Sequence, residues 1–370
     1  MVGYIPLELV QLIASAALAL GDNPREEERR ARFALAKSLS LVCRSWRAVG
    51  QGALFRKVFV YAGQPNHGFL RSRHHLLSHV YELEVDAHVG SAMLDNKLAR
   101  CRRDCDKLRS VSLTTPGAWS AWFSPARKVS PAESVTKVFM TVYYEDDASD
   151  AIRAALSGSR QFPNAHDVSL ILSSSSPTAT FPDLQGSTPW VAVRSLQIVV
   201  HLPAGPHSSL VRALSHVFPL CNLTTLVIST ARASLAFCPV LREATAVQLL
   251  SIFVAVPELS SFIRQMVPAL AVMSRLRALS VAAHNIDGRG GGHHFLPLSF
   301  LAKLPPSVGI VNLDLAVADA SRPAFEAFLA QRLEGPLFSW TATRLDSAGA
   351  GEADTWEKVR RNGTMAWVRE

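Results

Sequence analysis

VRSLQI (residues 193–198) and LTTLVI (residues 223–228) share one pattern, with apolar residues at the first, fourth and sixth positions. Seven further segments follow it: VYELEV, LRSVSL, VTKVFM, AHDVSL, VQLLSI, LRALSV and VGIVNL, where the first position of AHDVSL is a small alanine. Alternation of apolar and other residues predicts a strand with one buried face. The nine expected strands are centred on Leu83, Val111, Val138, Val168, Leu196, Leu226, Leu250, Leu279 and Val311.

The centres are 24–32 residues apart, a spacing even enough to indicate an internal repeat. Segments with apolar residues at helical spacing follow several strands: residues 93–105, 148–156, 208–218, 259–273 and 324–333. Strand then helix at this period resembles the leucine-rich repeat of the long, irregular kind. That resemblance implies an α/β fold whose parallel strands form a solenoid around one continuous core. The asparagine that usually follows the strand is missing from most repeats.

The first sixty residues predict three helices and carry a second resemblance. Ile5-Pro6-Leu7-Glu8-Leu9-Val10 and Leu39-Ser40-Leu41-Val42-Cys43-Arg44-Ser45-Trp46-Arg47 resemble the two halves of the F-box, with residues 21–32 as an insertion between its first two helices. Gly50 and Gly52 interrupt the last helical pattern. The resemblance implies docking onto the Skp adaptor of a Skp–cullin–F-box ubiquitin ligase. The implied adaptor-binding residues are Ile5, Pro6, Leu7, Leu9, Leu12, Ile13, Leu39, Leu41, Val42, Cys43 and Trp46.

Three regions are therefore expected. Residues 4–56 form the F-box-like helical module, residues 57–340 form the leucine-rich-repeat-like solenoid, and residues 341–370 form a linker and a C-terminal capping tail. The Gly-, Ala- and acid-rich residues 346–354 are expected to be the linker. Arg361-Asn362-Gly363-Thr364 predicts a hairpin turn, after which Trp356 and Trp367 would cover the open end of the solenoid.

Composition narrows the class of protein. Of the 370 residues, 48% are hydrophobic and 18% charged, which excludes a disordered chain. The net charge is +8, but no Lys/Arg run is longer than two, so we expect no nucleic-acid partner. Five cysteines, an odd number, favour reduced thiols in the cytoplasm or nucleus. The apolar stretch at residues 213–231 is interrupted by histidine, proline and asparagine, and we expect no membrane span.

Candidate chemistry is sparse. Cys101 and Cys105 share a helix face, but no second pair of ligands accompanies them, and core cysteines are the favoured interpretation. The basic residues around them (Arg100, Arg102, Arg103, Lys107 and Arg109) are typical of a solvated helix face, with partner binding as the alternative. The tandem histidines and the glycine-rich residues 288–292 match no metal or phosphate motif. We expect no catalytic residue, no metal and no cofactor.

The sequence thus predicts a non-catalytic substrate-recognition subunit of a Skp–cullin–F-box-type ubiquitin ligase. Its partners would be the Skp adaptor with its cullin complex and an unknown target protein. In such solenoids the strand residues between the apolar positions line the concave face. The expected target-binding residues are Lys137, Phe139, Ser169, Gln197, Ser251, Ser280 and Asn312, in one row with Ser112 and Val227. Two alternatives stay open: a repeat-type scaffold without a ligase role, and an enzyme with dispersed catalytic residues.

Overall fold

The computed structural model divides into two compact units, Met1–Phe139 and Met140–Glu370. The structure describes residues 31, 34–39, 41, 44–61, 74–86, 98–99, 101–115, 118, 122, 131–143, 157–173, 188–201, 207–230, 234–255, 259–284, 303–317, 339–345, 351–361 and 364–369. The expected helices at residues 148–156 and 324–333 and most of the F-box-like first half lie outside these ranges.

The first unit combines short helices with parallel strands. Its β1 pairs with β2 and its β2 with β3, both in parallel, and Leu83 lies opposite Val111. The backbone N–H of Lys137 donates to the carbonyl of Arg109 (2.9 Å), so β4 starts beside the start of β3. The elements are α3 (Arg44–Leu54), β1 (Lys57–Tyr61), α5 (His74–Leu77), β2 (Glu82–Asp86), β3 (Ser110–Leu113) and β4 (Lys137–Tyr143), which continues into the second unit.

Helix α3 corrects one expectation. Gly50 and Gly52 do not interrupt the helix, which runs through both to Leu54. Gly50 is buried, and a Cβ on Gly52 would lie 3.7 Å from Nδ1 of His79, an ordinary van der Waals separation. Glycine costs roughly 1 kcal/mol in a helix interior. Packing of the helix therefore outweighs the local preference against it.

The second unit is built on parallel strands paired in chain order. From β5 to β11, each strand pairs in parallel with the next one in the chain. The strands are β5 (Asp167–Ser173), β6 (Ser195–His201), β7 (Thr225–Thr230), β8 (Leu249–Ala255), β9 (Ala278–His284), β10 (Ile310–Val317) and β11 (Ser339–Leu345). The α/β class with a parallel sheet is therefore confirmed.

The predicted strand centres form one row of the core. Val168, Leu196, Leu226, Leu250, Leu279 and Val311 lie opposite one another along successive strands. All nine predicted centres, including those of the first unit, are at most 2% exposed. The prediction of buried centres is therefore confirmed. The physical reason for the burial is that alternation along a strand places every second side chain on the same face.

A backbone turn precedes each strand. It begins three residues before the first apolar residue of the sequence pattern. In every repeat the first apolar residue donates its backbone N–H to the carbonyl three residues earlier, as Val193 does to Trp190 (3.3 Å) and Leu276 to Met273 (3.0 Å). Ala165, the weakest first position, is fully buried and closes the same turn with Phe162. The rings of Phe162, Trp190 and Phe218 stack in succession, with centroids 6.3 and 5.9 Å apart. These turns therefore belong to the core.

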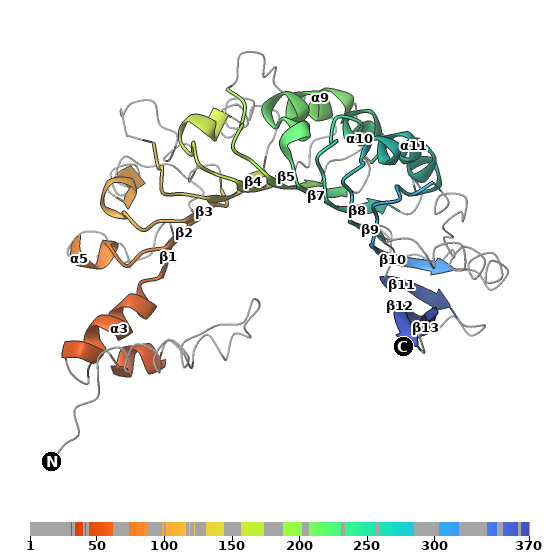
Figure 1. Cartoon of the computed structure of the whole chain (residues 1–370). Helices are drawn as coiled ribbons and strands as arrows, with labels where there is room; N and C mark the ends of the chain where they lie inside the picture. Colours follow the sequence, from red (N-terminus) through yellow and green to blue (C-terminus); the bar gives the residue numbers. More distant parts are fainter. Residues whose placement is uncertain are drawn as a thin grey trace. The chain divides into compact units, whose positions relative to one another are not determined.

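Helices cover one face of the strands of the second unit (Figure 1). The expected helices at residues 208–218 and 259–273 are confirmed as α9 (His207–Val217) and α11 (Leu259–Val272). Helix α10 (Ser234–Leu241) was missed because its sequence, SLAFCPVL, has almost no polar residue to mark a helical period. Two short 3-10 turns, Ser157–Arg160 and Leu220–Asn222, are also among the described elements of this unit.

The C-terminal residues end the second unit with antiparallel strands. The predicted hairpin is confirmed: β12 (Gly351–Arg361) and β13 (Thr364–Arg369) pair with Arg361 opposite Thr364. The expected linker at residues 346–354 is corrected, because β12 already begins at Gly351, opposite Leu345 of β11. Pairing with β11 supplies the strand here despite an unfavourable local composition. The covering role of Trp356 and Trp367 stays a prediction.

Candidate protein-binding surface

The strands of the second unit present one face away from the buried row. Residues directly after the strand centres lie in register: Ser169 opposite Gln197, and onward to Asn312. We call this set the open row: Ser169, Gln197, Val227, Ser251, Ser280 and Asn312. Its members are exposed or half-buried, and none is charged. Five of the seven predicted target-binding residues thus fall in one line across six strands.

The first unit places the other two predicted residues on β4. Lys137 is exposed and Phe139 half-buried. Strands β1 and β2 of the same unit carry charges on their accessible face, which sequence reasoning did not consider. Nζ of Lys57 lies 3.2 Å from Oε2 of Glu84 and 4.8 Å from the ring centroid of Phe59. The accessible strand face of the first unit is therefore charged, whereas the open row is not.

Two exposed apolar residues border the open row and were also missed. Leu249 and Ile310, the first residues of β8 and β10, are 42% and 39% exposed. Both lie opposite Ala278 of the intervening strand β9. The sequence does mark these two residues. Leu249 and Ile310 occupy the third position of the pattern, which is a large apolar residue only in VQLLSI and VGIVNL.

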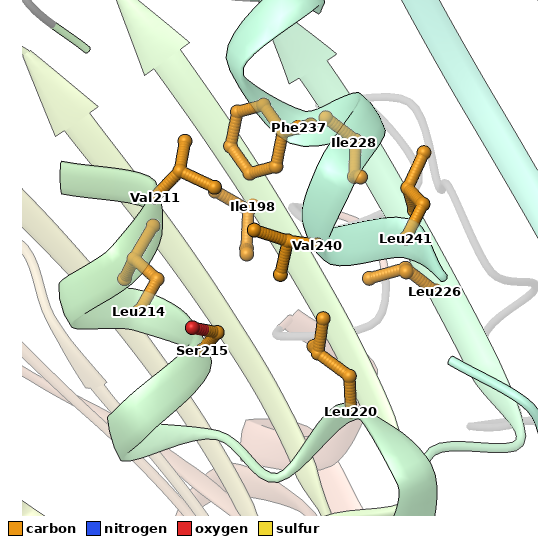
Figure 2. A pocket seen from close by; sticks show the side chains of 10 residues that line it. All are labelled: Ile198, Val211, Leu214, Ser215, Leu220, Leu226, Ile228, Phe237, Val240 and Leu241. Carbon is orange, nitrogen blue, oxygen red and sulfur yellow. The ribbon is translucent and has the colours of Figure 1, made fainter. Parts of the chain in front are cut away.

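The cavity between helices and strands does not suit a ligand. Side chains of α9, α10, β6, β7 and the 3-10 turn at Leu220 line it (Figure 2), and Ser215 is its single polar residue. The Ser215 hydroxyl already donates to the carbonyl of Arg212 (2.9 Å). The cavity has a volume of about 10 Å³. That space holds about one water and leaves no room for a substrate.

The cysteine-bearing helix of the first unit packs into the core. Cys101 and Cys105 are free and buried, and the N–H of Cys105 donates to the carbonyl of Cys101 (2.9 Å). Within the described ranges no group of three or more His, Cys, Asp or Glu residues is placed to hold a metal ion.

Arg102 departs from the expected solvated face. Its guanidinium lies over the ring of Trp122, 5.2 Å from the centroid, and Nη1 donates to the Trp122 carbonyl (3.1 Å). Burial lowers the pKa of Arg102 to about 10. Arg103 is helical and exposed, as predicted. Lys107 and Arg109 are exposed but lie beyond the helical residues 101–104, and Arg100 lies outside the described residues.

The predicted adaptor-binding residues are described only in part. Leu41 is helical and 74% exposed, Leu39 is helical and half-buried, and Trp46 lies in α3. An exposure of this size is unusual for a leucine, and it leaves most of the side chain available for a partner. The remaining predicted residues lie outside the described ranges: Ile5, Pro6, Leu7, Leu9, Leu12, Ile13, Val42 and Cys43.

Within the described part of the chain, no helix is long and apolar enough to cross a membrane. Comparison with protein-family models gives no match, and comparison with curated proteins gives none either.

Proposed function

We propose that the chain is the substrate-recognition subunit of a Skp–cullin–F-box-type ubiquitin ligase in the cytoplasm or nucleus. The N-terminal helices dock the Skp adaptor, the strands form a leucine-rich-repeat-like solenoid that holds a target protein, and other subunits transfer ubiquitin. The chain itself is not catalytic. Its physical role is to raise the effective concentration of the target near the ubiquitin-carrying enzyme.

The open row is the observation that carries the target-binding part of this proposal. Its side chains are uncharged, all but that of Val227 can form hydrogen bonds, and they run across six parallel strands from Ser169 to Asn312. At ~4.8 Å between strands the two ends are about 24 Å apart. A row of this length suits a protein partner better than a metabolite, and its lack of charge suits a partner selected by shape and hydrogen bonds.

The adaptor-docking part rests on the F-box resemblance of residues 4–56 and on the exposure of Leu41. A leucine that is 74% exposed leaves apolar area in water, which costs free energy unless a partner covers it. Its position within residues 39–47, the more specific half of the resemblance, supports the Skp adaptor as that partner.

Copurification from cell extract tests the proposal. The tagged full-length chain should bring down the Skp adaptor and the cullin, and the double variant Leu9→Asp/Trp46→Ala should bring down neither. The circular dichroism spectrum of the variant serves as the control for folding. If the unaltered chain captures target proteins without adaptor or cullin, it is a repeat-type scaffold with no ligase role.

A further inference from the structure

We propose that the edge of the second unit where β8, β9 and β10 begin binds an acidic, partly apolar peptide segment. The inference rests on the proposed function, since it names the chemistry of a target that the repeats would hold. It lies beside the open row, because it concerns the turns that precede these strands and the first residue of each strand.

The three turns at this edge are built alike and lie next to one another. The N–H groups of Val247, Leu276 and Val308 each donate to the carbonyl three residues earlier, at 3.3, 3.0 and 3.1 Å. The carbonyl of Gln248 accepts from Arg277 and Ala278 of the next turn, and the carbonyl of Arg277 accepts from the turn after that. Equivalent positions of successive turns are therefore held about one strand spacing apart, ~4.8 Å.

Four cations lie within these turns or at most two residues from them in sequence. We call Arg242, Arg275, Arg277 and Lys303 the basic edge; all four are exposed. In the part of the chain that the structure describes, none of these four side chains donates a hydrogen bond or pairs with a carboxylate. By contrast, Nη1 of Arg194, on an earlier turn, donates to the carbonyls of Val191 and Val193.

The charge of the basic edge is almost unopposed. Residues 241–249, 272–280 and 303–311, all of them described, contain these four cations and a single carboxylate, that of Glu243. Cations on or beside neighbouring turns attract an acidic partner and repel a basic one. Charge complementarity thus fixes the sign of the partner.

Exposed apolar residues next to the basic edge indicate that the acidic partner also carries apolar side chains. Leu249 and Ile310 lie on either side of Ala278, which directly follows Arg277 in sequence. Ala278 between them carries only a methyl group and is half-buried. A segment that carries Asp or Glu beside Leu, Ile or Phe would pair with the cations and cover these apolar residues together.

The same residues argue against a nucleic acid. Single-stranded nucleic acids are held by a basic surface combined with aromatic side chains on which the bases stack. Residues 241–249, 272–280 and 303–311 contain no aromatic residue. The aliphatic side chains present there suit the side chains of a peptide instead.

Selection from a random peptide library tests the inference while the target protein is still unidentified. Peptides about twelve residues long, which span ~40 Å when extended, are displayed and selected on the full-length chain. We expect the selected peptides to be enriched in Asp and Glu together with large apolar residues. A synthetic copy of the most enriched peptide should bind Arg275→Gln/Arg277→Gln about tenfold more weakly in fluorescence anisotropy, because charge-assisted hydrogen bonds are lost.

The matched control is Arg212→Gln/Arg264→Gln, which removes the same charge from exposed positions on α9 and α11. Affinity should change less than about twofold, since these sites lie on the helices. The inference is overturned if selection yields no acidic enrichment, if the control pair weakens binding equally, or if a single-stranded DNA of equal charge binds as tightly as the peptide. Adaptor copurification is measured separately, so its failure would reject the proposed function and leave the peptide result standing.

Discussion

The hydroxyl of Ser169 donates a hydrogen bond to Oε1 of Gln197 on the neighbouring strand, at 3.2 Å. The two residues are 28 positions apart in sequence and directly opposite each other in the sheet. A contact between side chains of the open row shows that its members lie close enough to act on one partner. It also leaves the Gln197 amide nitrogen available to donate to that partner.

Charged substitutions in the open row should block target capture. Ser251→Arg/Ser280→Glu places two opposite charges on adjacent strands of an uncharged row, where a shape-selected partner would have to desolvate them. Proximity labelling in cells should lose the target proteins while adaptor copurification stays unchanged. The matched variant Ser261→Arg/Gln265→Glu carries the same charges on exposed positions of α11 and should retain the targets. An unchanged set of labelled proteins in the first variant would place recognition elsewhere.

Leu41→Asp should weaken adaptor binding without unfolding the chain. Because the side chain is 74% exposed, a carboxylate there meets water in the free chain and an apolar surface in the complex. We expect a loss of at least about tenfold in adaptor affinity in a binding titration, which corresponds to ~1.4 kcal/mol. Val191→Asp, at a site 60% exposed in the second unit, is the control and should leave the affinity unchanged. Equal affinities for Leu41→Asp and the unaltered chain would remove Leu41 from the docking surface.

Neighbouring residues of β8 should differ in their effect on stability. Leu250 is fully buried and Ser251, one residue later, belongs to the open row. Leu250→Ala should lower the free energy of unfolding by ~2–5 kcal/mol through lost burial and a new cavity. Ser251→Ala should change it by less than about 0.5 kcal/mol. Urea unfolding followed by circular dichroism measures both, and similar losses would contradict the assignment of the two faces.

The small cavity of Figure 2 should accept one additional methylene group. Val211 lines it, so Val211→Ile is expected to raise the free energy of unfolding by ~0.5–1 kcal/mol. Val217, on the same helix, is fully buried outside the cavity, and Val217→Ile should be destabilising by about 1 kcal/mol or more because it overpacks the core. Urea unfolding measures the free energy of unfolding of both variants. A lower value for Val211→Ile than for the unaltered chain would show that the cavity cannot hold the added methylene group.

The contact between Arg102 and Trp122 should be independent of pH near neutrality. Burial lowers the pKa of Arg102 to about 10, so the native state releases this proton at lower pH than the unfolded chain does. The unfolded state then binds more protons above about pH 10, and stability relative to Arg102→Met should rise with pH there and stay constant below. Urea unfolding of both proteins across this range checks the sign. A relative stability that falls above pH 10 would contradict the assigned cause.

The repeat was predictable because its signal is local. Alternation within six residues marks the buried side of each strand, and the Asn362-Gly363 pair marks the hairpin. The same alternation, without any information on pairing, assigned Ser169, Gln197, Ser251, Ser280 and Asn312 to the accessible face. Helix α10 escaped because a segment that is apolar on all sides has no period, and β12 escaped because its strand depends on pairing with β11.

The sequence by itself determined which residues are buried and how often the strand recurs, since both follow from spacing along one short segment. Only the tertiary structure decided which repeats stand side by side and in what register. Leu249, Ala278 and Ile310 are about thirty residues apart from one to the next, and the backbone hydrogen bonds between strands bring them together. The basic edge arises in the same way, because the turns that carry its four cations become neighbours only when the strands pair. Pairing is a non-local property, and no single segment encodes it.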